Sequence, residues 1–372
     1  MKAIVHIGAP KTGSSTIQEF LFLNTEALAA RGFRFQRNVP GRGSQYEYPL
    51  AALATMGRLL PGREEQTRYS STDLATHQGT GAAVLAEFAA SRAGWSEPVA
   101  LFSSEHIYPW IIAPEEIAAL DLMFAAHFDE VRYILYIRSQ DDMIVSEYSE
   151  ALKRGSNLRL NGLIDQRRTT LIWEPRVRTW EKAVGRARFD LRLFDPTFLA
   201  DRDLLCDFAL ACGFTLDGLV TPPRANESLS AAAAECLRMM NDRIPQLLHD
   251  GTPNPLHWGV VWNLTNMMPA DAPSLALTAE QYARVQGIVG PSNERLRADF
   301  FPDRTTLFSK PKERKLAPRM EVLEEALDLM ARLCIRLRLG QIKGLSDEEQ
   351  RISIQRTRGG VSNGIALAPE EG

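Results

Sequence analysis

The chain has 372 residues, of which 45% are hydrophobic and 24% are charged, and its formal net charge is −3. This composition is typical of a globular protein with a substantial core. The nearly balanced charge excludes a broadly basic surface of the kind that binds nucleic acid, so we expect no nucleic-acid partner.

The cysteines and the N-terminal segment bear on the cellular compartment. None of the four cysteines forms a CxxC pair or stands at zinc-ligand spacing from a histidine, so we expect no metal site. Cys206 and Cys212 lie in an apolar helical run and are interpreted as buried free thiols, which fits a reducing compartment. No signal-peptide segment precedes the first predicted strand, and no apolar stretch has membrane-spanning length. We therefore expect a cytoplasmic protein with no integral membrane segment.

Strand and helix patterns alternate along the first 213 residues. Four nearly continuous apolar segments predict strands that are covered on both faces: Ala3–Ile7, Val99–Ser103, Val131–Ile137 and Phe189–Phe194. Helical periodicity occurs at Ser15–Ala30, Ala82–Arg92, Glu115–Phe128, Asp142–Lys153, Leu171–Val184 and Arg202–Cys212. Asp201 is the expected N-cap of the last helix, and Gly213 is its expected C-terminal stop. The alternation predicts an α/β fold with a central, mostly parallel sheet flanked by helices.

Irregular segments and a C-terminal extension complete the predicted organisation. Three long insertions are expected to form walls of the pocket for an acceptor substrate: Phe35–Thr80, Gly155–Thr170 and His249–Pro273. We expect one α/β domain over residues 1–308, and a connector, an amphipathic helix and a flexible tail over residues 309–372. The apolar stripe of this helix is predicted at Leu323, Leu327, Met330, Cys334 and Leu337. Docking of the helix on its own domain is favoured over dimerisation, and a monomer and a homodimer both stay open.

A loop rich in glycine and hydroxyl residues follows the first predicted strand. It reads Gly8-Ala9-Pro10-Lys11-Thr12-Gly13-Ser14-Ser15-Thr16 and leads directly into a helix. Backbone N–H groups of such a loop, together with the positive end of the helix dipole, form an anion site. Lys11 adds a mobile cation, and Thr12, Ser14, Ser15 and Thr16 add hydroxyl donors. A solvated strand-to-helix turn is the simpler alternative.

The loop departs from the ATP-binding pattern GxxxxGK[ST] at one position. Gly8 and Gly13 have the required spacing, but Ser14 stands where an ATPase needs its lysine, and Lys11 lies two residues before the second glycine. The third predicted strand ends in Arg138 rather than in an acidic residue that would help to hold magnesium. These differences disfavour an ATP-dependent kinase, which is kept as an alternative.

Arg138 and Ser146 form a second candidate anion site. Arg138 ends a predicted strand, at the edge where ligands bind in open α/β sheets, and Ser146 lies on the next predicted helix. A guanidinium fork suits phosphate oxygens, so the two side chains are expected to grip one phosphate from two sides. Taken alone, a pairing of Arg138 with Asp141 or Asp142 at the helix start would be the preferred interpretation.

Taken together, the two segments resemble those of sulfotransferases that use 3′-phosphoadenosine 5′-phosphosulfate (PAPS), in particular bacterial and carbohydrate-type members. The resemblance rests on Pro10–Thr16 for the 5′ phosphosulfate and on Arg138, Asp142 and Ser146 for the 3′-phosphate. Weaker similarities occur at Leu191–Asp195, Arg224–Ser230 and Asn293–Leu296, so the resemblance covers roughly residues 1–308. Many members have Asn-Pro where this chain has Ser139-Gln140. The resemblance implies a P-loop-type sulfotransferase fold, PAPS as donor, adenosine 3′,5′-bisphosphate (PAP) as product and no metal.

Sulfuryl transfer requires stabilisation of the departing phosphate oxygen and removal of a proton from the acceptor. Lys11 is the expected stabilising cation, a role that the resemblance also implies, with Ser14, Ser15 and Thr16 in support. Glu105 and His106 follow the second predicted strand at the same sheet edge and are the candidate bases, with Glu105 preferred. Either could instead be an ordinary loop residue.

The acceptor is expected to be a hydroxyl or amine on a small molecule or glycan, with carbohydrate preferred by analogy with polysaccharide-modifying members. A second alternative to catalysis is a family member that binds nucleotide without transferring sulfate.

Overall fold

The computed structural model describes residues 1–36, 44–223, 228–268, 272–309 and 319–343. Contacts divide the chain into two compact units, each assembled from separate chain segments. The first, here named the sheet unit, comprises Met1–Ser139, Trp173–Arg224 and Ser292–Ser309. The second, here named the helical unit, comprises Gln140–Ile172, Ala225–Pro291 and Lys310–Gly372. The domain boundary expected after residue 308 stays a prediction.

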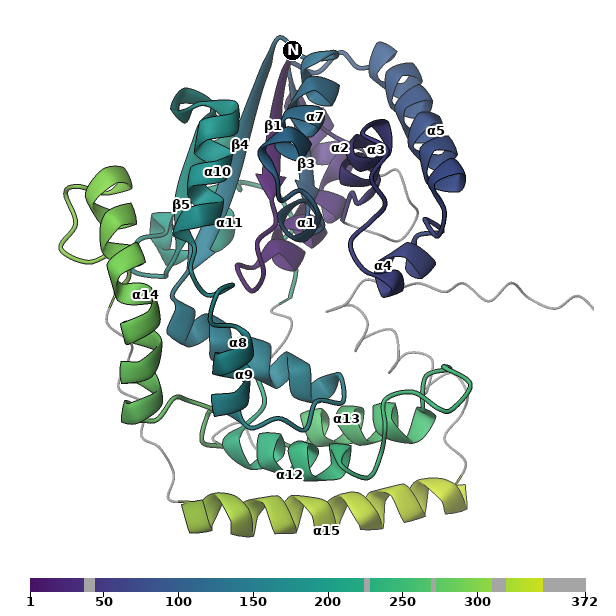
Figure 1. The fold of residues 1–372 in the computed structure, drawn as a ribbon, viewed down its shortest axis with the longest axis vertical. Coiled ribbons are helices and arrows are strands. Elements are labelled where there is room, and N and C mark those ends of the chain that lie inside the picture. Colours follow the sequence, from purple (N-terminus) through teal and green to yellow (C-terminus); the bar gives the residue numbers. More distant parts are fainter. Residues whose placement is uncertain (37–43, 224–227, 269–271, 310–318, 344–372) are drawn as a thin grey trace, which may run out of the picture. The chain divides into compact units, whose positions relative to one another are not determined.

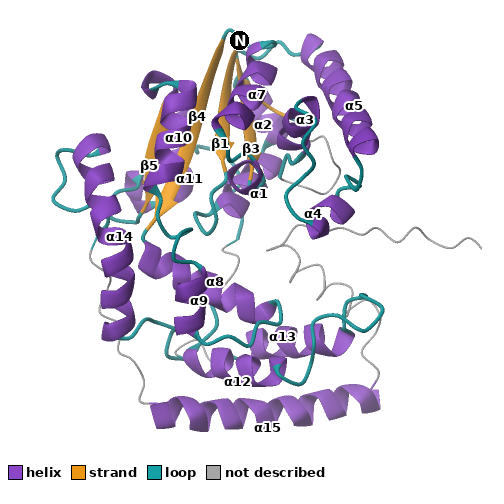
Figure 2. Cartoon of the chain, in the orientation of Figure 1, coloured by secondary structure: helices purple, strands orange, loops and turns teal. Residues whose placement is uncertain are grey.

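The sheet unit is built on five strands that all run parallel. In spatial order they are β2 (Phe33–Phe35), β3 (Val99–Ser104), β1 (Lys2–Ile7), β4 (Glu130–Arg138) and β5 (Phe189–Phe194). Figure 2 shows the sheet among its helices. The predicted α/β class with a central parallel sheet is confirmed, and the four predicted strands are present. The fifth strand, β2, has only three residues, too few to produce a recognisable pattern.

The strand order places a topological switch at β1. The chain leaves β1 towards β2 and β3 on one side, and after β3 it crosses to β4 on the other side. In open parallel sheets, ligands bind at the carboxyl ends of the strands where such a reversal occurs. The residues that follow β1, β3 and β4 therefore occupy the expected ligand edge.

Helices cover both faces of the sheet (Figure 1). One face packs against α1 (Ser14–Leu23), α2 (Thr25–Ala29) and α11 (Leu204–Cys212), and the other against α3 (Glu47–Thr55), α5 (Leu74–Ala93), α7 (Pro114–Ala125) and α10 (Glu174–Val184). On β4, Ile134 and Tyr136 join the first cluster, whereas the ring of Tyr133 lies 5.4 Å from that of Trp180 on the second face. Residues two apart share a face, so successive β4 residues contribute to opposite layers of the core.

The predicted helix Ser15–Ala30 is interrupted at Asn24, which separates α1 from α2. The Asn24 side chain donates to the Val220 carbonyl at 2.8 Å and accepts from the Val220 N–H at 2.7 Å. The same amide also donates to the Phe20 carbonyl at 2.8 Å. Asn24 thus links the end of α1 to a distant segment, a contact that helical periodicity cannot reveal.

Two further details of the sheet unit differ from expectation. The predicted insertion Phe35–Thr80 contains α3, α4 (Arg63–Arg68) and the start of α5, with residues 37–43 outside the described part. The N-cap of α11 is Asp203, whose carboxylate accepts from the N–H groups of Leu205 and Cys206, so the prediction of Asp201 was wrong. Gly213 ends α11 in a left-handed conformation, as predicted. Short helices at Ile107–Trp110 (α6), Arg186–Arg188 (η1) and Ala200–Arg202 (η2) complete the sheet unit.

The helical unit contains α8 (Gln140–Lys153), α9 (Leu160–Gln166), α12 (Ala231–Asn241), α13 (Pro255–Met267) and α15 (Arg319–Lys343). The predicted insertions Gly155–Thr170 and His249–Pro273 contain α9 and α13 and are therefore less irregular than expected. The helix α14 (Ala279–Phe300) carries Pro291, the last residue of the helical unit before the chain returns to the sheet unit.

The C-terminal helix α15 packs along α12 and α13. Its fully buried residues are Ala326, Leu329 and Leu333, whereas Leu327 and Cys334 of the predicted stripe are exposed. The helix was predicted correctly, but its buried face was not. The predicted tail after residue 343 lies outside the described residues.

The cysteines and the helix lengths also bear on the sequence predictions. All four cysteines are free thiols. Cys212 is buried as expected, whereas Cys206 is only half-buried. Along the described ranges, no helix combines the length and apolar character needed to cross a bilayer.

Candidate functional site

The loop between β1 and α1 has a constrained backbone. The Gly8 N–H donates to the Ser104 carbonyl at 3.0 Å, which continues the β1–β3 ladder into the loop. Lys11 has φ 62° and Gly13 has φ 78°, both in the left-handed region. For a residue with a side chain, this conformation costs about 1–3 kcal/mol and is most often found at functional sites. The strain at Lys11 is consistent with a loop shaped for binding.

Side-chain donors occupy two carbonyl groups of this loop. The hydroxyls of Thr12 and Ser14 both donate to the Ala9 carbonyl, at 2.9 and 3.2 Å. The Arg138 guanidinium donates to the Lys11 carbonyl at 3.0 Å. Each carbonyl oxygen carries partial negative charge that would repel a phosphate, and a bound donor offsets it. The loop is therefore electrostatically suited to an anion. Thr12 is fully buried and its hydroxyl is used within the loop, so its predicted contact with cofactor would have to come from its backbone N–H.

Two glycines allow this loop to contact its neighbours closely. A Cβ on Gly8 would lie 2.6 Å from the Glu105 Cα. A Cβ on Gly13 would lie 2.3 Å from the Leu204 Cδ2 and 3.3 Å from the Phe194 ring. Real Cβ atoms essentially never approach other atoms closer than 3.0 Å, so a side chain at Gly8 would clash with backbone and displace the loop. At Gly13, a side chain would move Leu204 and would also be strained by the positive φ.

The N-terminus of α1 presents backbone donors at the end of the loop. Its N-cap residue, Gly13, has no side chain to bind them. Within the described chain, the amides of Ser14 and Ser15 have no hydrogen-bond partner. Ser15 and Thr16 are half-buried in the first turn of the helix. Unpaired N–H groups and the helix dipole together favour a negatively charged ligand here.

Arg138 is the last residue of β4 and lies against this loop. Its guanidinium is 5.3 Å from the centre of the Phe194 ring, a cation–π contact with the end of β5. The Trp173 indole donates to the Arg138 carbonyl at 2.8 Å and fixes the backbone that carries it. The structure thus brings Arg138 and the Lys11 loop together. The sequence did not indicate that Phe194 and Trp173 contact Arg138, because an aromatic residue in a predicted strand or helix is usually interpreted as a core residue.

Ser146 lies in the second turn of α8 and is half-buried. This helix belongs to the helical unit, whereas Arg138 belongs to the sheet unit. That Arg138 and Ser146 bind the same phosphate group therefore stays a prediction. Asp141 on the same helix accepts two hydrogen bonds from Gln286, at 2.8 and 3.0 Å.

The two candidate bases, which follow β3, differ in their surroundings. Glu105 is half-buried, and its backbone lies directly against Gly8. His106 is buried, with Nδ1 3.1 Å from the Ser44 hydroxyl and Nε2 2.7 Å from the Tyr69 hydroxyl. Both ring nitrogens of His106 are therefore engaged, which favours a structural part for this histidine. Tyr46, considered as a sugar-stacking residue, lies against Tyr69 and His106 in the same cluster.

Beneath the loop, His6 is a fully buried histidine on β1. Its Nδ1 lies 2.8 Å from the Ser103 hydroxyl, and its ring makes edge contacts with Tyr136 and Phe208. Burial lowers the pKa of His6 to about 3, so the ring is neutral near pH 7. A charged imidazolium is thus not part of this anion site.

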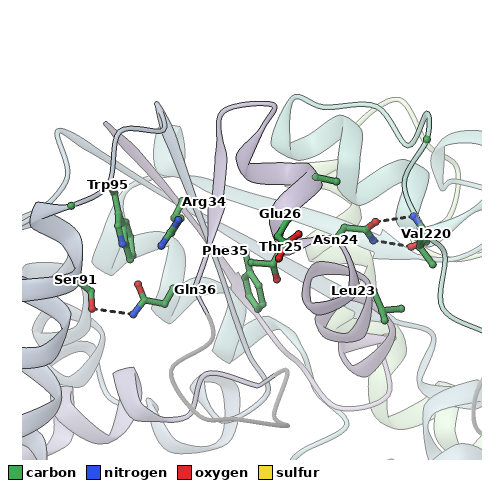
Figure 3. A pocket seen from close by; sticks show the side chains of 13 residues that line it. Leu23, Asn24, Thr25, Glu26, Arg34, Phe35, Gln36, Ser91, Trp95 and Val220 are labelled. Carbon is green, nitrogen blue, oxygen red and sulfur yellow. Dashed lines mark hydrogen bonds between the residues drawn. The ribbon is translucent and has the colours of Figure 1, made fainter.

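A cavity of about 870 Å³ lies elsewhere in the sheet unit, along the edge strand β2 (Figure 3). It is lined by Leu23–Ala27, Arg34–Gln36, Ser91, Gly94, Trp95, Gly218 and Val220, and none of the predicted site residues is among them. Its polar side chains are largely paired within the protein, for example Gln36 with Ser91 at 3.1 Å. In the described part of the chain, no three His, Cys, Asp or Glu residues form a group suited to a metal ion.

Comparison with known proteins yields little beyond this geometry. No family model matches the chain, and no curated protein matches it. Among solved structures, it is similar to a sulfotransferase from Alicyclobacillus acidocaldarius, with 14% sequence identity and a TM-score of 0.40. The match covers 79% of this chain and 94% of that one. Similarity at this level assigns neither a family nor an activity.

Proposed function

We propose that this protein is a sulfotransferase that moves a sulfuryl group from PAPS to a hydroxyl or amine acceptor. The observation that carries the proposal is the hydrogen bond from the Arg138 guanidinium to the Lys11 carbonyl. It supports one continuous anion-binding edge, formed by a strand-end arginine and a phosphate-type loop. A donor with phosphate groups at both ends of a nucleoside suits such an edge.

The proposed reaction is an in-line displacement. The acceptor oxygen or nitrogen forms a bond to sulfur while the bond from sulfur to the bridging phosphate oxygen breaks, and PAP leaves with the added negative charge. Lys11 and the amides of Ser14 and Ser15 would stabilise that charge. Glu105 would take the acceptor proton, a role supported by its contact with Gly8 and by the engaged ring nitrogens of His106. Arg138, with Ser146 as its expected partner, would bind the 3′-phosphate.

Carbohydrate or a glycoconjugate is the proposed acceptor class, and this part rests on the sequence resemblance alone. Trp258 and Trp262 on α13 could stack on sugar rings. In the structure, Trp258 contacts His257, and Trp262 lies 5.7 Å from the Arg336 guanidinium.

The proposal is tested first by binding. Calorimetry should detect PAP and should detect Mg-ATP weakly or not at all. Arg138→Ala should weaken PAP binding about 10- to 100-fold, which corresponds to a charge-assisted contact of roughly 1.5–3 kcal/mol. Arg68→Ala is a matched control, since Arg68 pairs with Glu64 and Glu65 on α4. Tighter binding of Mg-ATP than of PAP would favour the kinase alternative.

Transfer from labelled PAPS to an acceptor library then tests catalysis. Lys11→Ala should lower turnover by about 10²–10³-fold, with a smaller effect on PAP affinity. Wild-type turnover in this variant would refute the assignment of Lys11. A wild-type protein that binds PAP but transfers sulfate to no acceptor would favour a non-catalytic nucleotide-binding protein.

A further inference from the structure

The C-terminal helix α15 has two opposite apolar faces. One face is buried against α12 and α13 and contains Ala326, Leu329 and Leu333, all fully buried. A helix that served only to cover its own unit would need no second apolar face.

The second face is exposed and contains large apolar residues. Met320, Leu327 and Ile335 are 65%, 62% and 60% exposed, and Ala331 and Cys334 on the same face are also exposed. At about 100° per residue, these five residues fall within an arc of about 100°, opposite the buried face. We call this arc the outer face of α15.

Charged residues lie mainly along one side of the outer face, and their sign changes along the helix. Glu321, Glu325 and Asp328 lie on the first half of this flank, and Arg332 and Arg336 lie on its second half. By helical position, Glu324 and Arg338 fall within the arc of the outer face itself and follow the same order of sign. Asp328 and Arg332 pair across the middle at 2.8 Å. The flank is therefore acidic towards the N-terminus of α15 and basic towards its C-terminal half.

We propose that the outer face of α15 binds the outer face of a second copy of this chain, with the two helices antiparallel about a two-fold axis near Ala331. In an antiparallel helix pair, each flank faces the same flank of the partner. The acidic half of one flank then lies against the basic half of the other. In a parallel pair, the acidic halves of the two helices would lie at the same level, and the complementarity would be lost.

The positions of the side chains agree with this register. With Ala331 at the axis, Leu327 of one helix lies at the level of Ile335 of the other, and it lies next to Cys334 of the other helix on the same side of the outer face. A small residue at the crossing point lets the two backbones approach closely, and the larger apolar residues interlock on either side. An anionic membrane surface is a poorer match, since interfacial helices carry lysine and arginine along the whole polar face rather than an acidic half.

The interaction is tested by sedimentation velocity on the full-length protein over about a hundred-fold range of concentration. We expect a reversible monomer–dimer equilibrium. Leu327→Glu should raise the dimer dissociation constant about tenfold or more. Leu122→Glu is the matched control, because Leu122 on α7 is 69% exposed and distant in sequence. Circular dichroism checks that both variants are folded. A protein that is monomeric at every concentration, or equal dissociation constants for the two variants, would overturn the proposal.

Disulfide trapping tests the orientation. In a Cys206→Ser background, Leu327→Cys should form an intermolecular disulfide with Cys334 of the partner subunit upon mild oxidation. Within one helix these positions are seven residues, or about 10.5 Å, apart along the axis, so they cannot pair with each other. Cross-linking of Cys334 to Cys334 of the partner subunit would indicate parallel helices and contradict the proposed register. Dimerisation that appears only after removal of residues 344–372 would mean that the tail covers this face, and would also contradict the proposal. None of these measurements depends on the proposed catalytic activity.

Discussion

Replacement of Gly8 by alanine tests whether the contact between Glu105 and the loop that joins β1 to α1 matters for function. The new Cβ would lie 2.6 Å from the Glu105 Cα and 2.9 Å from the Ser104 carbonyl oxygen, whereas ordinary contacts begin at 3.4 Å. The loop and the end of β3 must therefore separate by about 0.8 Å, and the hydrogen bond between Gly8 and Ser104 lengthens. We expect a loss of about 1–3 kcal/mol in the free energy of unfolding. If Glu105 is the base proposed above, a displacement of this size relative to its substrate should lower turnover about 10²-fold.

Gly81→Ala provides the control for this experiment. Its Cβ would lie 2.3 Å from the Ala54 Cβ, where α5 packs on α3, so it introduces a comparable clash away from the loop. Urea denaturation should show that both variants are destabilised, and turnover should be measured at a temperature where both are folded. We expect turnover to fall only in Gly8→Ala. Wild-type turnover in Gly8→Ala, or an equal loss in Gly81→Ala, would refute the reasoning.

Three further changes probe the base, the core and the pH dependence. Glu105→Gln should slow sulfuryl transfer at least about tenfold without changing PAP affinity. His106→Asn should chiefly lower the melting temperature. If instead His106→Asn slowed transfer and Glu105→Gln did not, His106 would be the base. Asp207→Asn should cost roughly 1.5–3 kcal/mol in urea denaturation at pH 7, because it removes the closer of the two carboxylates that pair with Arg192. Arg192 binds Asp207 through two hydrogen bonds of 2.7 and 2.9 Å and Asp190 through one of 3.2 Å; an unchanged midpoint would contradict this. His6 is neutral in the folded protein, so its contribution to stability is complete above pH 6.5 and is lost as pH falls towards about 3. Between pH 7 and pH 5, the free energy of unfolding should fall by about 2 kcal/mol more in the wild-type protein than in His6→Gln. Equal decreases in the two proteins would show that His6 does not cause this pH dependence.

The sequence predicted the elements that depend on local pattern. Four strands, the parallel sheet and the strand–loop–helix unit at Lys11 all follow from apolar runs and glycine spacing. Arg138 was placed at the correct edge because the carboxyl ends of parallel strands align. The sequence could not show that the Arg138 guanidinium binds the Lys11 carbonyl, since residues 127 positions apart meet only in the folded sheet.

The features that were missed depend on tertiary contacts. Asn24, where α1 ends, binds Val220, and the engagement of His106 depends on Ser44 and Tyr69. The buried face of α15 is set by the surfaces of α12 and α13 rather than by the strongest apolar stripe in its own sequence. Local periodicity identifies a helix but not the side that another element will cover.

The packing of α15 on α12 has a practical consequence for expression of shortened proteins. A chain ended at residue 308 would lack α15, and the side of α12 that α15 covers would face water. Such a chain would gain an apolar surface patch, a common cause of aggregation and poor recovery. An inactive preparation of that fragment would then report on solubility rather than on chemistry, so activity assays should use protein that retains residues 319–343.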